Sequence, residues 1–377
     1  MRVALVYNQK KEDPTQQSDA DESTEPPSSR TAIPQTIILP PHAQPSVNHI
    51  TDVYAEWDTF ETISAVRDAL AQLHDVILIE ADEDSYEKLR AKRPEIVFNI
   101  AEGLFGISRE AQIPALLEML QIPYTGSDPL TLAICLDKSR AKEILAYYHI
   151  PTPQFSVIST FLELENVTMQ FPSMVKPLHE GSSKGIYNSS VVTTQSELRR
   201  EVTVILEHYK EPAIVEEYLS GREFTVAMLG NEPHVTALPI VEIKFDSLPA
   251  GVQPIYSYEA KWIWDRADAP LDIFECPAKI SPHLQNEIEM ICRTAYKTLR
   301  CRDWCRIDVR LDATGQPNIL ELNPLPGILP NPEDNSCFPK AARAADLQYN
   351  ELIQTVLALA AKRCGLINAA SSFQTKR

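Results

Sequence analysis

Five charged or amide residues alternate with apolar ones in the stretch CRIDVRLDATGQPNILELNPLPG, residues 305–327. The pattern predicts two strands joined by the turn residues DATGQP, with Arg306 and Asp308 on the first strand and Glu321 and Asn323 on the second. Because side chains alternate faces along a strand, a hairpin can bring both polar pairs to one face. Two carboxylates and an amide suit Mg²⁺, which proteins hold with one or two carboxylates plus substrate phosphates. An amphipathic hairpin with a hydrated face explains the pattern equally well.

The same alternation makes predictions for the neighbouring residues. Arg310 joins the polar face of the first strand, where it has no assigned role beyond a structural or surface one. Ile319 joins the polar face of the second strand, and Leu320 and Leu322 form the opposite face.

A second candidate for chemistry is the segment VKPLHEGSSKGIYNSSVV, residues 175–192, which we interpret as strand, loop and strand. Its loop offers several backbone N–H groups, two hydroxyls and a lysine, with Lys176 at the end of the first strand. Such a loop can fold over phosphate oxygens, although a plain hairpin loop has the same composition. Because no glycine precedes Gly103 and no GxxxxGK[ST] motif occurs, dinucleotide-binding and P-loop sites are excluded.

Composition limits the partners and the compartment. The chain has 377 residues, 44% of them hydrophobic, which is enough for two or three domains. Its formal net charge of −17, without a basic run, disfavours nucleic acid and anionic membranes as partners. No apolar stretch approaches the length of a membrane span, and the first residues resemble a strand rather than a signal peptide. Seven cysteines without a CxxC pair predict free thiols, so we expect a cytoplasmic protein.

The pattern of elements predicts a chain of mixed class. Alternating strands and helices in 60–101, after a strand at 3–7, predict a parallel sheet covered by helices, whereas residues 9–50 predict a long, partly disordered loop. One helix is predicted for 128–150. Residues 155–240 read as an antiparallel-rich α+β unit, and helices at 282–299 and 341–363 complete the chain. The fold class is therefore α/β combined with α+β.

Seven motifs occur in an order that identifies a family resemblance. They are LDKSRAK (136–142), VKPLHEGSSKGI (175–186), IVEEYLSGREFTVAML (214–229), YSYEAKW (256–262), CRIDVRLD (305–312), LELNPLPG (320–327) and NSCFPKAA (335–342). From about Pro94 onward the chain resembles the ATP-grasp ligases, in the D-alanine–D-alanine ligase branch. The resemblance implies a Rossmann-like N-terminal substrate domain (1–130), a central ATP-grasp lid domain (131–216) and a C-terminal ATP-grasp catalytic domain (217–377).

The resemblance implies an ATP-dependent reaction. The carboxylate of one substrate becomes an acylphosphate, and the amine of a second substrate attacks it, releasing ADP and phosphate. The implied cofactors are ATP and two Mg²⁺ ions, which Mn²⁺ could replace. The implied partners are small carboxylates and amines, and the implied assembly is a homodimer.

Roles on the ATP side follow from the matching positions. Lys138 and Lys176 resemble the two lysines that contact the phosphates, and Glu180 and Ser183 lie in the lid over them. Lys261 resembles the lysine of a mobile loop that reaches the γ-phosphate. The adenosine is implied to lie against Glu216, Glu217 and Leu219, where backbone groups recognise adenine, and against Glu223, which resembles the ribose carboxylate.

The remaining roles concern the reacting groups. Asp308, Glu321 and Asn323 resemble the ligands of the two Mg²⁺ ions, and Arg306 resembles the residue that stabilises the tetrahedral oxyanion. Ser182 lies on the substrate side of the lid. Gly327 and Ser336 would border the carboxylate of the acceptor.

The substrate side departs from the family pattern. The family's first Gly-rich loop is absent, and Glu56 falls where the acid that holds the first substrate's ammonium is expected. Glu102 stands in place of a histidine, and Trp262 in place of a tyrosine of the mobile loop. Ligase chemistry is therefore expected without D-alanine being the required substrate. Two alternatives remain: a phosphotransferase of the same fold that needs no amine, and an ATP-binding protein that has lost catalysis.

Overall fold

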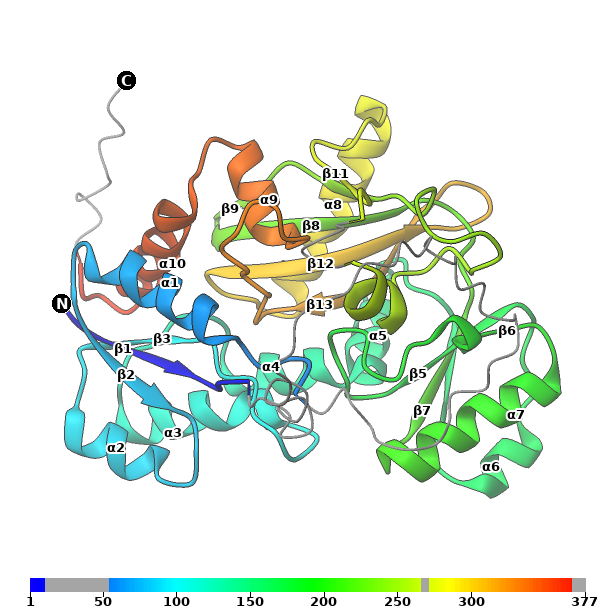
Figure 1. Ribbon diagram of the computed structural model, residues 1–377, viewed down its shortest axis with the longest axis horizontal. Coiled ribbons are helices and arrows are strands. Elements are labelled where there is room, and N and C mark those ends of the chain that lie inside the picture. The colour runs from blue at the N-terminus through cyan, green and yellow to red at the C-terminus, as the bar shows by residue number, and fades with distance from the viewer. Residues whose placement is uncertain (11–53, 266–270, 368–377) are drawn as a thin grey trace, which may run out of the picture.

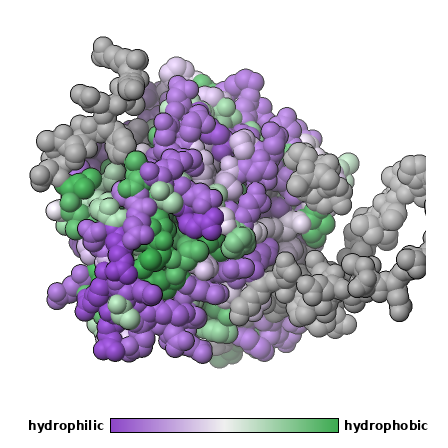
Figure 2. Space-filling model, turned by 60° about the vertical axis from the view of Figure 1, so that its left-hand side comes forward, coloured by the Kyte–Doolittle hydropathy of each residue, from purple (hydrophilic) through white to green (hydrophobic). Residues whose placement is uncertain are grey.

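The computed structural model describes residues 1–10, 54–265 and 271–367, and these form three sheets with helices packed against them (Figure 1). The loop predicted for 9–50 lies almost entirely outside the described residues. The sequence-predicted domain boundaries stay a prediction. The face in Figure 2 is mostly hydrophilic, with hydrophobic side chains gathered in a few small patches.

The first sheet is parallel and has the strand order β2-β1-β3. Its strands are β1 (Arg2–Tyr7), β2 (Asp75–Glu80) and β3 (Ile96–Asn99). Helix α1 (Phe60–Ala71) lies on one face, together with the C-terminal helix α10 (Tyr349–Arg363); helices α2 (Ser85–Lys92) and α3 (Gln112–Leu120) lie on the other (Figure 1). Alternation along β1 explains this arrangement, because Val3 and Leu5 pack toward α1 and α10 while Ala4 and Val6 pack toward α2 and α3.

The second sheet, here called the lid sheet, is antiparallel with the order β4-β7-β5-β6. It contains β4 (Phe155–Ile158), β5 (Ser173–Pro177), β6 (Val191–Val192) and β7 (Ala213–Glu217). One face packs on α6 (Phe161–Asn166), α7 (Gln195–Val204) and the π-helical turn Ile205–Tyr209. Because Val175 and Val215 point into that core, their neighbours Lys176 and Glu216 point to the opposite face.

The third sheet is the largest and has the order β11-β10-β8-β12-β13, with β9 paired to β8. Its strands are β8 (Glu223–Asn231), β9 (His234–Ala237), β10 (Val241–Ile243), β11 (Phe274–Glu275), β12 (Trp304–Leu311) and β13 (Pro317–Asn323). Helix α8 (Pro282–Thr298), capped by Ser281, buries its apolar side against Phe224, Val226 and Ile307. The even-numbered residues of β12 therefore point away from α8.

Two predicted helices are each divided. The helix predicted for 128–150 breaks at Asp137, an extended residue that ends α4 (Pro129–Leu136) and caps α5 (Lys138–Tyr147). Its side chain accepts hydrogen bonds from the N–H groups of Ser139 and Arg140, so a carboxylate at this position starts a second helix. The C-terminal helix is likewise two, α9 (Cys337–Ala344) and α10, because the backbone leaves the helix after Ala344 and Asp346 adopts a left-handed conformation.

The predicted faces of the second hairpin strand are wrong at two positions. Strand β13 carries a bulge: Glu321 pairs with Asp308, but Ile319, not Leu320, pairs with Val309. A bulge adds one residue and reverses the alternation beyond it. Ile319 is therefore fully buried beneath α8, and Leu320 lines a cavity on the opposite face.

Candidate functional site

Two adjoining cavities lie where the three sheets meet. The first, of about 90 Å³, is here called the carboxylate cavity; it lies between residues near β3, the lid loop after β5 and the loop after β13. The second, of about 140 Å³, is here called the two-sheet cavity, because the lid sheet and the largest sheet form its walls. The cavities share Glu180, Gly181, Ser182, Lys261, Arg306 and Glu321. Every sequence-predicted site residue lines one or both, except Trp262 and Ser336.

The hairpin face predicted to hold a metal is assembled at the boundary between the cavities. Arg306 Nη2 lies 2.9 Å from Asp308 Oδ2 and 3.6 Å from Glu321 Oε1. Asn323 Nδ2 lies 3.3 Å from Glu321 Oε1, and Thr225 Oγ1 donates a hydrogen bond of 2.6 Å to Asp308 Oδ1. The polar residues of the two strands face each other because Asp308 and Glu321 are directly paired across the strands.

The surroundings shift the pKa values of the two carboxyl groups of this face in opposite directions. Burial raises the pKa of Asp308, and Arg306 opposes that effect. Burial alone would also raise the pKa of Glu321, but Lys138, Arg306 and Lys176 lower it to about 2. Glu321 is therefore ionised throughout the physiological range and lies among three cations.

The donor set fits Mg²⁺ held jointly with phosphates. The described residues contain no group of three or more His, Cys, Asp or Glu side chains arranged to hold a metal. Two carboxylates and one amide oxygen supply only part of an octahedral shell, which is the usual protein share when phosphate oxygens supply the rest.

A buried lysine pair lies beside this face. Glu216 Oε2 accepts from Lys176 Nζ at 2.7 Å, and Glu216 Oε1 lies 3.0 Å from Lys142 Nζ. Burial alone would raise the pKa of Glu216, but the two lysines lower it to about 2. Lys142 also donates to Leu320 O at 2.8 Å, which fixes the bulge. The predicted role of Glu216 beside adenine, where backbone groups act, stays a prediction; its carboxylate positions Lys176.

The remaining wall of the two-sheet cavity combines apolar and polar groups. Leu219 is buried, and Glu217 is exposed at the rim. Arg310 is buried and donates from Nη1 to Glu223 at 2.8 Å and from Nη2 to Pro254 O at 2.7 Å. Burial raises the pKa of Glu223, and Arg310 opposes that effect. Arg310, which was predicted without a specific role, therefore holds Glu223.

The lid loop 180–185 lies between the cavities and bends sharply. Ser182 and Ser183 have φ values of 50° and 61°, in the left-handed region. Ser183 Oγ donates to Tyr256 O at 2.9 Å, and Trp262 Nε1 donates to Ser182 O at 3.1 Å. Trp262 thus contacts the lid loop rather than lining a cavity. A side chain at Gly181 would clash, because its Cβ would lie 2.5 Å from Glu56 Oε1.

Lys261 reaches both cavities from a π-helical turn, Glu259–Trp264. Burial, reinforced by nearby Arg306, lowers its pKa to about 8. Its ammonium lies 5.2 Å from the ring centre of Trp262. A partly discharged lysine gains charge when an anion such as phosphate enters the site.

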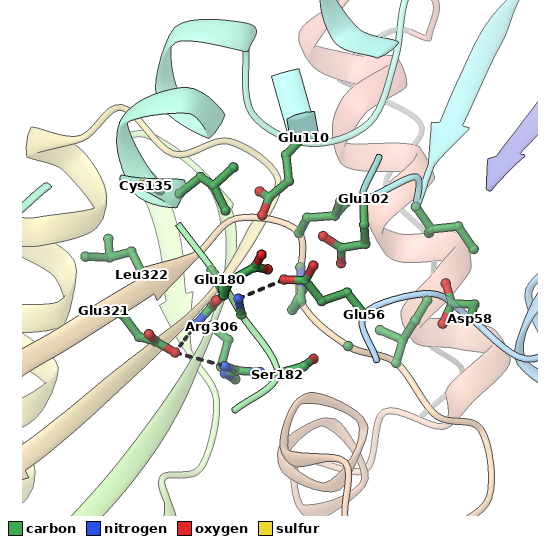
Figure 3. Close-up of a pocket in the computed structure, with 18 of the residues that line it drawn as sticks. Glu56, Asp58, Glu102, Glu110, Cys135, Glu180, Ser182, Arg306, Glu321 and Leu322 are labelled. Carbon is green, nitrogen blue, oxygen red and sulfur yellow. Dashed lines mark hydrogen bonds and ion pairs between the residues drawn. The ribbon is translucent and has the colours of Figure 1, made fainter. Parts of the chain in front are cut away.

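Three acids line the end of the carboxylate cavity nearest the first sheet. Glu56, Glu102 and Glu110 turn their carboxyl groups toward a common space, opposite Arg306 and Glu321 (Figure 3). Glu56 is held by Arg109 and by Gly181 N. Burial raises the pKa of Glu102 well above its usual value and that of Glu110 to about 8.

The loop after β13 forms the cavity's remaining wall. Gly327 lines the cavity. Ser336 is buried behind it, donates from Oγ to Gly327 O at 3.3 Å and accepts from Leu329 N at 3.2 Å. Ser336 therefore supports the loop and does not face the cavity.

Sequence analysis missed several charged residues of the site, among them Arg109, Glu110 and Lys142. Lys142 follows Lys138 by four residues, so the helical spacing already placed both on one face of α5. Arg109 and Glu110 carry no such signal, because they lie in a short 3₁₀ turn (Arg109–Ala111), which has no helical or strand periodicity in the sequence.

Comparisons with known proteins decide the family. Residues 144–358, more than half of the chain, match the family model described as D-ala D-ala ligase C-terminus. The chain belongs to the D-alanine–D-alanine ligase family. This membership makes it an ATP-dependent ligase that forms C–N bonds, on an ATP-grasp fold.

Individual relatives agree with that assignment. A D-alanine–D-alanine ligase of Pelotomaculum thermopropionicum is 32% identical, over 77% of this chain and 87% of the relative. One from Bordetella avium is 33% identical, over 78% and 86%. A Sinorhizobium fredii protein named only y4sG is 36% identical, over 77% and 84%.

Solved structures show the same fold. The D-alanine–D-alanine ligase of Bacillus anthracis, complexed with ATP, superposes with a TM-score of 0.67 at 21% identity, covering 97% of this chain and 99% of that one. The VanG D-Ala:D-Ser ligase of Enterococcus faecalis has a TM-score of 0.65 at 19% identity, covering 95% and 99%. No helix among the described residues is long and apolar enough to cross a membrane.

Proposed function

We propose that this ligase joins the carboxylate of one amino acid to the amine of a second amino acid or small metabolite. The observation that carries the proposal is the shared wall of the two cavities. There Arg306, Lys261 and Glu321 face both the two-sheet cavity and the carboxylate cavity. A phosphoryl group and a carboxylate can therefore meet beside cations and metal ligands.

The proposed residue roles follow the two cavities. ATP occupies the two-sheet cavity, with its phosphates toward Lys138 and Lys176 and its ribose against Glu223. Asp308, Glu321 and Asn323 would hold Mg²⁺, which would supply positive charge against the transferring phosphoryl oxygens. The ion pairs around Glu216 keep Lys176 charged and in place.

The carboxylate substrate lies in the carboxylate cavity. One of its oxygens attacks the terminal phosphorus, the bond to ADP breaks, and an acylphosphate forms. The acceptor amine then attacks the carbonyl carbon, loses a proton, and expels phosphate. Arg306 stabilises the negative charge that develops on the carbonyl oxygen, because its guanidinium lies at the boundary where both reacting groups meet.

The lid loop excludes water from this step, which matters because an acylphosphate open to water hydrolyses. Ser182 faces the carboxylate cavity, and Trp262, through its bond to Ser182 O, keeps the loop in contact with the segment that carries Lys261. Two features stay predictions: a homodimer, and a cytoplasmic location, which the seven free cysteines favour.

A substrate panel tests the proposal. ADP release is measured with pairs of amino acids, beginning with D-alanine, in the presence and absence of the amine acceptor, and the product is identified by mass spectrometry. We expect ADP release that depends on both substrates. Turnover that needs no amine would indicate a phosphotransferase, and ATP binding without any turnover would indicate lost catalysis; either result would overturn the proposal.

A further inference from the structure

The carboxylate cavity is lined by more carboxyl groups than the ammonium group of one substrate can pair with. Its lining includes Glu56, Asp58, Glu102 and Glu110, and also Glu180, which lies at the boundary with the two-sheet cavity. Glu180 pairs with Lys184 at 2.7 Å and with Arg109 at 3.2 Å, and Glu56 pairs with Arg109 at 2.8 Å. Among the residues that the structure describes, the carboxyl groups of Asp58, Glu102 and Glu110 have no hydrogen-bonding or ion-pairing partner.

The same cavity also has an apolar lining. Ile100, Leu136 and Ile328 are buried and line it, together with Leu325 and Pro326. A cavity lined by both apolar groups and acids suits a side chain with a methylene stem and a cationic tip, such as that of a basic amino acid.

A metal ion is a poorer occupant for this group of acids. The described residues contain no set of three or more acidic, His or Cys side chains with the geometry to hold a metal. A flexible cationic side chain makes smaller demands on geometry, because a single ammonium donates three hydrogen bonds in adjustable directions.

We propose that the carboxylate-donating substrate is a basic amino acid, whose side-chain amine or guanidinium binds between Glu102 and Glu110. This proposal rests on the proposed ligase function and adds the substrate class. Glu56 and Asp58 add negative potential around this side-chain cation. The substrate's carboxylate faces Arg306, Lys138 and Lys261, which line the same cavity.

The protonation of the two acids agrees with this binding mode. Burial raises the pKa of Glu102 well above its usual value, and Glu110, Glu56 and Asp58 raise it further. Burial and Glu56 raise the pKa of Glu110 to about 8, against Arg109 and Lys138. Burial therefore favours the protonated form of both carboxyl groups, and an entering cation favours the ionised form.

The test compares each basic amino acid with a neutral analogue, in both enantiomers. Lysine is compared with norleucine and ornithine with norvaline, which lack the terminal nitrogen, and arginine with its isostere citrulline. Phosphate release gives kcat/KM for each with the wild type, E102Q/E110Q, and E83Q as control. Glutamine resembles a protonated glutamate in size, so the double variant should fold. Glu83 is exposed in the same N-terminal part of the chain.

We expect the wild type and E83Q to prefer the basic member of at least one pair by 10-fold or more, and E102Q/E110Q to lose about 10-fold of that preference. Equal or greater kcat/KM for the neutral members, with turnover intact, would overturn this inference and leave the ligase function standing.

A binding measurement distinguishes failure of this inference from failure of the proposed ligase function. Calorimetry with lysine and norleucine, in the presence of a non-hydrolysable ATP analogue and Mg²⁺, reports affinity without turnover. Tighter binding of lysine that E102Q/E110Q removes would support the inference even if no acceptor yields product. Equal affinities, or a preference that survives E102Q/E110Q, would overturn it.

Discussion

Arg109 holds both carboxylate oxygens of Glu56 through a single nitrogen, Nη2, at 2.9 and 2.8 Å, with both side chains almost wholly buried. The same guanidinium donates from Nη1 to His179 O at 2.9 Å and pairs with Glu180. Arg109 and Glu56 come from the N-terminal part of the chain, whereas His179 and Glu180 follow β5. The arginine therefore ties the closed lid loop to the wall of the carboxylate cavity.

Removing this arginine should destabilise the protein. Arg109→Met preserves much of the volume but leaves Glu56 as a buried charge without its cation, so we expect the free energy of unfolding to fall by about 3 kcal/mol. Urea denaturation measures the change. Arg67→Met is the matched control, because Arg67 pairs with Asp68 at the surface, where an ion pair contributes little to stability. Equal effects of the two substitutions would refute the claim that the buried pair of Arg109 and Glu56 stabilises the fold.

Asp308 should set the requirement for Mg²⁺. Asp308→Asn keeps the size of the side chain but removes one of the two carboxylates of the proposed metal site, so we expect the Mg²⁺ concentration for half-maximal activity to rise about 10-fold or more. Activity is measured across an Mg²⁺ titration. Asp346→Asn, at an exposed left-handed position that asparagine also adopts, is the control. An unchanged titration curve for Asp308→Asn would remove Asp308 from the metal site.

Arg306 should act on the chemical step and not on nucleotide binding. Arg306→Ala removes a cation from the position of the developing oxyanion, so we expect kcat to fall by about 100-fold or more. The Kd for ATP, measured by calorimetry, should stay within about 3-fold of wild type, since the lysines that contact the phosphates remain. The exposed Arg90→Ala is the control for both quantities. A large loss of ATP affinity would contradict the oxyanion role.

His179 should make stability depend on pH. Burial alone would lower its pKa, but Asp137 and Glu211 raise it from 6.5 to about 9. Because the folded-state pKa is the higher one, protonated His179 stabilises the fold fully below pH 6.5, and this contribution disappears as the pH rises through about 9.

The pH effect is measured against a variant. Between about pH 6 and 9.5, the wild type should lose on the order of 1 kcal/mol of unfolding free energy more than His179→Gln does, a magnitude reduced by solvent screening. Parallel pH profiles for the two proteins, measured by urea denaturation, would show that the histidine is not held in its charged form.

The sequence predicted the parts of the site that follow a local period. Arg306, Asp308, Glu321 and Asn323 gather on one face because strand alternation places them there. The bulge in β13 broke that rule at Ile319 and Leu320, two consecutive apolar residues in an otherwise alternating strand. That doublet was the available signal, but only the contacts with Val309 and α8 decide which of the two enters the core.

Other parts of the site depend on contacts between distant segments. Glu56 and Arg109 are separated by 53 residues, and Arg310 and Glu223 by 87, so no spacing in the sequence predicts either pair. Each pair forms because burial makes an unpaired charge costly, and that burial exists only once the sheets have packed together.

The central claim is that the carboxylate substrate becomes an acylphosphate, and isotope transfer tests it most directly. A carboxylate substrate identified by the panel is labelled with ¹⁸O in both carboxylate oxygens and turned over with ATP and an amine. Mass spectrometry of the released phosphate should then show one ¹⁸O atom per product formed, because the attacking carboxylate oxygen leaves with the phosphate. Amide formation with no ¹⁸O in the phosphate would contradict the account.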